Sequence, residues 1–177
     1  MSLIYIKRAT LKELPEIMAI IQEAKDLLKA DHSPQWQSGY PDTQALHNDI
    51  MAQQCWLLMV GDQIAGTATM IVADDPNYQE IFNGQWHNTT DPYATIHRIA
   101  ISKAFGGQHL SHFFFSNLIT VATNAGIRNF RIDTHALNKR MQALATGFGY
   151  EYRGKIYVDE PAADHEENAR RAYELNL

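Results

Sequence analysis

The chain has 177 residues, of which 45% are hydrophobic and 20% are charged, and its formal net charge is −5. This length suits one domain that buries its own core. The acidic balance, without any basic stripe, argues against a nucleic-acid partner. No apolar run approaches the ~18 residues of a membrane helix, so we expect no membrane partner. Cys55 is the only cysteine, which excludes an internal disulfide and favours a cytoplasmic protein.

The first third of the sequence predicts one strand and two helices. Residues 3–8 alternate between apolar and polar side chains, as in a strand. Thr10 and Glu13 match a capping box, and apolar residues then recur at helical spacing to about Lys29. A loop follows, and Thr43 is a suitable cap for a second helix that runs to about Gln53.

The middle of the sequence predicts a hairpin, a long connection and a strand that leads into a helix. Residues 55–73 form two apolar runs joined by Gly61 and Asp62, which is typical of a hairpin. Residues 74–92 form a polar, aromatic-rich connection of a length that is usually functional. A strand is expected over residues 93–101, and after a glycine turn a helix to Ala125, where Gly126 ends it.

The last third predicts a strand over residues 129–135 and a helix capped by Asn138. Residues 150–159 are interpreted as a closing hairpin. Residues 161–177 are interpreted as a charged helical extension beyond a domain of residues 1–160. The order of elements indicates an α/β fold with a mixed sheet.

The turn in AISKAFGGQHLSHFFFSNLI (100–119) has the features of an anion site. Backbone N–H groups at a helix start lack intrahelical partners and carry partial positive charge. Gly106 and Gly107 allow a close approach of the backbone to a ligand. The turn lacks the lysine of a P-loop and the third glycine of a dinucleotide fingerprint. From these residues alone, a phosphate site and a plain strand–helix connection both remain open.

Leu3 to about Val158 resembles the GNAT N-acetyltransferase superfamily. The family turn reads [Q/R]-x-x-G-x-[G/A] after a strand that ends in an aliphatic residue, here Ile101, and it falls on residues 106–111. The chain departs from this pattern with glycine at position 106, His109 at the central glycine and Ser111 at the last position. Asn138 and the Gly149–Tyr150 pair match a second family pattern.

The resemblance implies a mixed, mostly antiparallel sheet flanked by helices, with acetyl-CoA as the co-substrate. The strand before the turn would bulge and pair with the pantetheine arm. The turn would hold the pyrophosphate, and the next strand and helix would contact the same arm. The residues that the resemblance assigns to acetyl-CoA are Ile99, Ala100, Ile101, Gly106, Gly107, Gln108, His109, Leu110, Ser111, Asn138 and Met141.

The resemblance leaves the acid–base residues of the transfer open. An amine with a pKa of ~10.4 must lose a proton to attack the thioester. Ala145 stands where many family members carry a tyrosine acid, and Thr95 stands where some carry a glutamate base. His97 lies two residues further along the same strand face, and imidazole is suited to proton relay. A packed histidine is the alternative reading of His97.

Other candidates depend on their place in loops or strands. Aromatic walls suit an amine cation, and the loops and strand ends supply Trp36, Tyr40, Trp86 and Tyr93. Further polar candidates are Glu80 and Asp91 in the long connection, Asp133 and His135 on one strand, and Lys139 and Arg140 near the expected phosphate. The eight histidines show no metal-ligand spacing, so no metal is expected.

The sequence therefore predicts an acetyl-CoA-dependent N-acetyltransferase in which an amine of a small molecule or a peptide attacks the thioester directly. A CoA-binding module of the same fold without catalysis is one alternative. An unrelated α/β binding domain is another. The resemblance is compatible with a homodimer.

Overall fold

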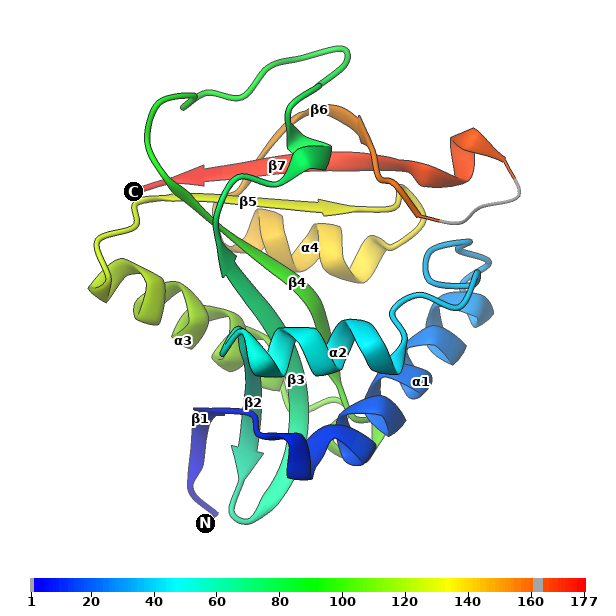
Figure 1. Cartoon of the computed structure of the whole chain (residues 1–177), viewed down its shortest axis with the longest axis vertical. Coiled ribbons are helices and arrows are strands. Elements are labelled where there is room, and N and C mark those ends of the chain that lie inside the picture. The colour runs from blue at the N-terminus through cyan, green and yellow to red at the C-terminus, as the bar shows by residue number, and fades with distance from the viewer. Residues whose placement is uncertain (1, 161–163) are drawn as a thin grey trace.

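A twisted seven-stranded sheet crosses the computed structural model, which describes residues 2–160 and 164–177 (Figure 1). The strand order is β1-β2-β3-β4-β5-β7-β6. Neighbouring strands are antiparallel except for the parallel pair β4–β5. The predicted mixed, mostly antiparallel sheet is thus confirmed. The strands are β1 (Ile4–Arg8), β2 (Cys55–Val60), β3 (Gln63–Val72), β4 (Tyr93–Ile101), β5 (Asn129–Thr134), β6 (Glu151–Tyr157) and β7 (Ala169–Asn176).

Helices cover both faces of the sheet. The helices α1 (Leu14–Ala30) and α2 (Thr43–Met51) pack on one face, and α3 (Leu110–Asn124) and α4 (Lys139–Gly147) pack on the other. Successive side chains of β2 point to opposite faces, so Leu57 enters the α1–α2 core and Leu58 enters the α3–α4 core. This double burial explains why the β2 sequence is apolar throughout rather than alternating. None of the described helices is long and apolar enough to cross a membrane.

Two caps set the starts of the first helices. Glu13 accepts a hydrogen bond from the Thr10 backbone N–H at 2.7 Å, as the predicted capping box requires. A short 3-10 turn, Leu11–Glu13, precedes α1. At α2 the prediction was off by one residue: Asp42 is the cap, and its carboxylate accepts from the Ala45 N–H at 2.8 Å. A carboxylate is as good a cap as a threonine hydroxyl, so the sequence allowed either.

The C-terminal segment differs from the prediction. Residues 169–176 are not helical but form β7, which lies inside the sheet between β5 and β6. Residues 150–159 contain the single strand β6, which pairs with β7 instead of folding on itself. The charged side chains enter the sheet because they are paired: Arg170 contacts Glu160, and Glu174 contacts Arg153. The domain therefore does not end before residue 161; residues 161–163 themselves lie outside the described residues.

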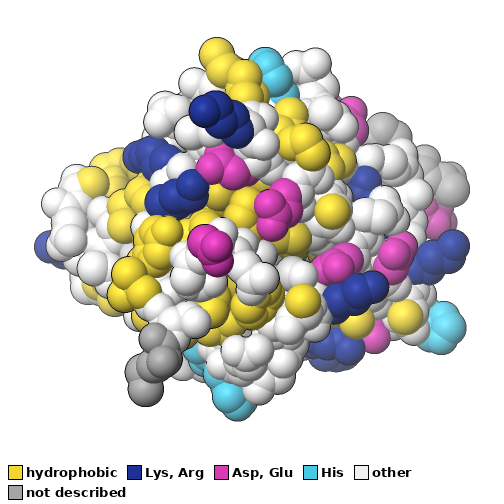
Figure 2. Space-filling view, turned by 90° about the horizontal axis from the view of Figure 1, so that it is seen from below, with side chains coloured by type: hydrophobic (Ala, Val, Ile, Leu, Met, Phe, Trp, Pro, Cys, Tyr) yellow, Lys and Arg dark blue, Asp and Glu magenta, His cyan; other side chains and the backbone are white. Residues whose placement is uncertain are grey.

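One end of the molecule exposes apolar surface. This end carries β1, the β2–β3 turn and the start of α1 (Figure 1). Seen from below in Figure 2, hydrophobic side chains gather in and around a hollow, with acidic and basic side chains beside it. The edge strand and the first helical turn contribute exposed apolar side chains here, among them Ile4, Tyr5 and Leu11.

The strands β4 and β5 open the sheet for a site. They pair only over Tyr93–Thr95 and Asn129–Arg131, at the start of each strand. Beyond that point β4 turns away from β5 (Figure 1). The side chains and backbone groups that line the opening are therefore free to face a ligand.

Candidate active site

A cavity of about 670 Å³ lies where α1, the end of β4, the glycine turn and α4 meet. We call it the donor cavity. All of the residues that the sequence assigned to acetyl-CoA line it, from Ile99–Ile101 through residues 106–111 to Asn138 and Met141. Arg140 also lines it and pairs with Asp31, whereas the side chain of Lys139 donates to the Ala136 carbonyl outside it.

The glycine turn takes left-handed backbone at two positions. Gly107 has a φ of +75° and His109, directly before α3, has a φ of +55°. His109 stands at the central glycine of the family pattern, and its backbone adopts the conformation that glycine favours. Histidine is among the residues that tolerate this region best. The departure at His109 therefore leaves the path of the turn intact, and its side chain is exposed.

The strand β4 contains the bulge that the resemblance implied. Thr69 pairs with His97 and Thr67 pairs with Ala100, so Arg98 and Ile99 face a single residue of β3. Arg98 has a φ of +52° at this point. A bulge re-aims the side chains on either side of it. Its result here is that Ile99 lies at the boundary between the donor cavity and a second cavity.

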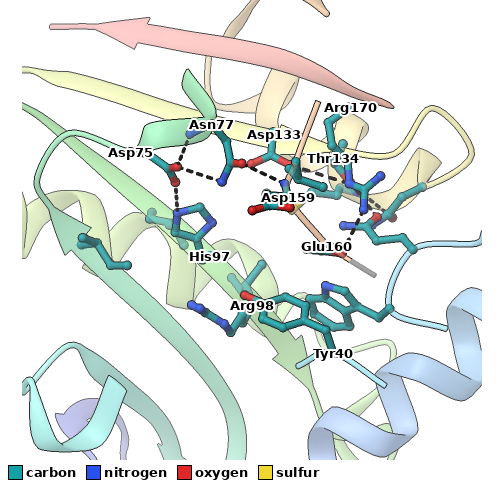
Figure 3. Close-up of a pocket in the computed structure, with 18 residues that line it drawn as sticks. Tyr40, Asp75, Asn77, His97, Arg98, Asp133, Thr134, Asp159, Glu160 and Arg170 are labelled. Atoms are coloured by element: carbon teal, nitrogen blue, oxygen red, sulfur yellow. Dashed lines mark hydrogen bonds and ion pairs between the residues drawn. The ribbon is translucent and has the colours of Figure 1, made fainter. Parts of the chain in front are cut away.

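The second cavity, of about 260 Å³, lies in the opening between β4 and β5 (Figure 3). We call it the acceptor cavity. It shares Trp36, Ile99, Asn138 and Met141 with the donor cavity, so the two spaces meet at these side chains. Asn138 is held in place because its side chain caps α4 through the Met141 N–H at 3.2 Å and its amide donates to Gln35 at 3.4 Å. The predicted wall residue Tyr40 also lines the acceptor cavity.

His97 lines the acceptor cavity and contacts a carboxylate from the long connection. Its Nε2 lies 3.2 Å from Oδ2 of Asp75. Burial by itself would raise the pKa of Asp75, but hydrogen bonds from His97 and Asn77 outweigh this and lower it below its usual value. An ionised carboxylate only accepts hydrogen bonds, so Nε2 carries the proton and a neutral His97 has its lone pair on Nδ1. Figure 3 shows His97 turned toward Asp75 at one side of the cavity.

Three further carboxylates and a buried arginine line the rest of the acceptor cavity. Nη2 of Arg170 lies 3.2 Å from Glu160, and Asp133 accepts from the Tyr78 hydroxyl at 2.7 Å. Burial raises the pKa of Glu160, and the charge of Arg170 offsets part of this rise. Burial, with the neighbouring Asp133 carboxylate, also raises the pKa of Tyr78, so this phenol remains a donor. Asp159 completes the group.

Sequence reasoning missed the long-range partners of His97. Asp75 precedes Pro76 and Asn77, a pattern typical of an Asx turn, but nothing in that pattern placed it beside β4. Two predicted wall residues have another role: Trp86 and Tyr93 enclose the Arg131 guanidinium, each at 4.2 Å. Three further predicted candidates line neither cavity: Glu80, Asp91 and His135.

No cluster of three or more potential metal ligands occurs within residues 2–160 and 164–177.

Comparisons with known proteins identify the family of this chain. Residues 21–150 match the model of the acetyltransferase (GNAT) family. A GNAT-family acetyltransferase from Streptococcus agalactiae is 31% identical with a TM-score of 0.86, over 98% of this chain and 95% of that one. Comparison with curated proteins gave no match.

More distant structures share the fold. An acetyl transferase from Salmonella typhimurium that modifies the N-terminal serine of ribosomal protein L7/L12 is 16% identical with a TM-score of 0.69, over 98% of this chain and 95% of that one. The L7/L12 acetyltransferase RimL in complex with coenzyme A is 16% identical with a TM-score of 0.70, over 98% and 94%. The chain belongs to the GNAT acetyltransferase family, as its sequence predicted, and is an acetyl-CoA-dependent acetyltransferase.

Proposed function

We propose that this chain acetylates a primary amine, of a small molecule or a peptide, with His97 as the general base. Acetyl-CoA occupies the donor cavity, with its pyrophosphate at residues 106–111 and its pantetheine arm along Ile99–Ile101. The acceptor amine enters through the acceptor cavity. The observation that carries the proposal is the shared wall of the two cavities, because Ile99 and Asn138 face both while His97 faces the acceptor side.

The transfer is a direct displacement at the thioester. The amine nitrogen attacks the acetyl carbonyl carbon, the N–C bond forms and the C–S bond breaks. The proton of the amine passes to Nδ1 of His97, either directly or through one water. The thiolate of coenzyme A leaves with the electron pair, and its ordinary pKa of ~8.5 makes strong acid assistance unnecessary.

Asp75 supports this role of His97. Its carboxylate fixes the Nε2–H tautomer, which leaves the basic nitrogen available on the other side of the ring. Asp75 is itself held by the backbone N–H of Asn77 at 2.9 Å and the side-chain amide of Asn77 at 3.0 Å. Its own backbone N–H donates to the Tyr93 hydroxyl at 2.7 Å. A carboxylate fixed at this many points is suited to orient a base.

The bulge of β4 supplies the backbone N–H groups that stabilise the developing oxyanion. Backbone N–H groups near Arg98 and Ile99 are turned out of the regular ladder by the bulge. Such groups stabilise the oxyanion that develops on a thioester carbonyl. In this arrangement the carbonyl lies against β4, with the base on one side and the amide of Asn138 on the other.

Thiol release from acetyl-CoA over a panel of primary amines tests the proposal. We expect His97→Ala to lower kcat by about 10²–10⁴-fold, the usual contribution of a general base, with little change in the KM for acetyl-CoA. The pH dependence of kcat should also change, because the variant lacks the group that takes the proton of the amine.

His87→Ala is the matched control, because this histidine lies on the long connection that precedes β4, is exposed, and lines neither cavity. If His97→Ala keeps both the wild-type kcat and the wild-type pH profile, His97 is a packed histidine and another group takes the proton.

A further inference from the structure

We propose that the acceptor is a small amine with a second positively charged group, which binds among Asp133, Asp159 and Glu160 while the first amine reacts beside His97. This inference rests on the proposed function, because it names the substrate class of the same cavity. Three features of the acceptor cavity support it: its excess of carboxylates, the pairing of its two arginines with protein groups, and its small volume with aromatic walls.

The charges of the acceptor cavity are unbalanced. Its lining includes the carboxylates Asp75, Asp133, Asp159 and Glu160, against the guanidinium groups of Arg98 and Arg170. Asp75 is already paired with His97. The other three carboxylates lie at the far side of the cavity with one guanidinium group, that of Arg170. Glu160 lies 3.2 Å and Asp133 lies 3.9 Å from this group. A second cation at this position would reduce the excess negative charge.

Asp159 is the carboxylate most available to a substrate. In Figure 3 its side chain lies between Asp133 and Glu160. Its backbone N–H donates to Asn77 at 2.9 Å, which fixes the chain at this point. Within the residues that the structure describes, its carboxylate has neither a hydrogen bond nor an ion pair. A carboxylate that is positioned through its backbone but left unpaired at a cavity wall can accept from an ammonium group without losing another partner.

The arginines are already engaged, which argues against an acidic second group on the acceptor. Arg170 is buried, and its Nη1 donates to the carbonyl oxygens of Glu167 at 2.6 Å and Ala169 at 3.2 Å. Arg98 pairs with the buried Asp49 at 3.2 Å and lies over the Tyr40 ring at 5.4 Å. Arg170 is therefore both ion-paired and hydrogen-bonded, and the charge of Arg98 is paired with Asp49, while Nε and Nη1 of Arg98 make no hydrogen bond within the described residues. A carboxylate on the acceptor would compete with these partners and would meet the unpaired acids.

The cavity suits a short flexible cation. Its volume of about 260 Å³ lies below the ~300–1,000 Å³ that are typical of drug-sized ligands. Trp36 and Tyr40 form part of its wall, and aromatic faces attract ammonium groups. One end opens to the donor cavity and the other end is acidic. A linear chain with an amine at each end has the matching distribution of charge.

Three probes of equal length and different end charge test the inference: 1,4-diaminobutane, 1-aminobutane and 4-aminobutanoate. We expect kcat/KM to be highest for the diamine, by about tenfold or more over the monoamine, which is the size of one charge-assisted hydrogen bond. The aminobutanoate should be the poorest substrate. The advantage of the diamine should shrink as salt is added, because ionic attraction is screened.

Asp159→Asn should remove most of the preference for the diamine while the KM for acetyl-CoA stays unchanged. Asp159→Lys should make 4-aminobutanoate the better substrate. The matched control is Asp62→Asn, which removes the same charge from the exposed β2–β3 turn outside both cavities. Asp159 is itself exposed, so neither substitution threatens the fold.

Three outcomes would overturn the inference. Equal kcat/KM for 1,4-diaminobutane and 1-aminobutane, with ready turnover of both, would overturn it and leave the proposed function standing. So would a peptide N-terminus that reacts far faster than any of the three probes. Absence of turnover with every amine, although acetyl-CoA binds, would overturn both the inference and the proposed function.

Discussion

The donor and acceptor cavities are neighbours, but they are encoded in different ways. Much of the donor cavity comes from one continuous stretch, Ile99 to His112, with α1 and α4 closing it. The acceptor cavity draws on the loop after α1, the long connection, β4, β5, the start of α4, the segment after β6, and β7. A ligand that the whole family shares can be held by a local motif. A ligand that differs between members is held by side chains from distant segments.

The two cavities also differ in how they hold charge. The donor cavity offers backbone N–H groups and a helix start, which favour an anion without needing a particular side chain. The acceptor cavity relies on paired and unpaired ionisable side chains, such as His97 with Asp75 and Arg170 with Glu160. Single substitutions in the donor cavity should therefore act by changing the backbone conformation. Single substitutions in the acceptor cavity should act by changing which atoms carry protons and charges.

The largest effect is expected from Gly107→Glu in the donor cavity. A Cβ at this position meets no atom within 4 Å, but the φ of +75° disfavours any side chain, and the new carboxylate would repel the pyrophosphate. Loss of two charge-assisted hydrogen bonds corresponds to roughly 10²–10⁴-fold in affinity. Isothermal titration with acetyl-CoA measures this loss, with Gly126→Glu as a control at a left-handed helix end outside both cavities. Wild-type affinity in Gly107→Glu would mean that the pyrophosphate lies elsewhere.

The next largest effect is expected from Asp75→Asn in the acceptor cavity. The new amide can donate to Nε2 of His97 and thereby move the ring proton to Nδ1, where the base is needed. We expect kcat to fall by about 10–100-fold, within the range of a general-base contribution, while the affinity for acetyl-CoA is retained. Steady-state kinetics with both substrates checks this separation. Asp74→Asn, the adjacent exposed acid outside both cavities, should leave kcat near that of the wild type.

If Asp75→Asn weakened acetyl-CoA binding as much as it lowered kcat, a substitution in the acceptor cavity would also affect the donor cavity, and the two cavities would not bind their ligands independently. Equal losses would indicate that Asp75 holds the opening between β4 and β5 rather than the tautomer of His97.

The same contrast explains what the sequence could and could not predict. The family, the sheet and the acetyl-CoA donor were predicted correctly from the order of the elements, the turn at residues 106–111, Asn138 and the Gly149–Tyr150 pair. These signals depend on neighbours in the chain. The strand β7 was missed because its charges, such as Glu174, suggested an exposed helix. Glu174 is buried because Arg153 and backbone N–H groups of the long connection surround it. Pairing of this kind depends on tertiary contacts that no local pattern records.

A smaller effect is expected where His109 replaces the family glycine. Left-handed backbone costs a residue with a Cβ about 1 kcal/mol relative to glycine, so His109→Gly should stabilise the fold by about 0.5–1 kcal/mol and leave acetyl-CoA affinity equal or tighter. His109→Val should destabilise it by about 1–2 kcal/mol, because β-branched residues are rare outliers in this region. Denaturant unfolding measures both. A loss of stability in His109→Gly would show that the imidazole makes a contact worth more than the backbone strain.

The smallest effect concerns Glu13, a locally encoded residue outside both cavities. Burial opposes its ionisation, but hydrogen bonds from Lys7 and Thr10 outweigh this and lower its pKa to about 2. The folded pKa lies below the ordinary value, so ionised Glu13 stabilises the fold at neutral pH, and this contribution disappears as the pH falls from about 4.5 to about 2. Glu13→Gln keeps a capping side chain but removes the charge, and should cost about 0.5 kcal/mol at pH 7. Wild type and variant should converge in denaturant unfolding near pH 2, with kcat and acetyl-CoA affinity unchanged at pH 7. A stability difference that persisted at acidic pH would assign the effect to packing rather than to charge. A change in kcat would show that the cap at the start of α1 influences the geometry of the cavities.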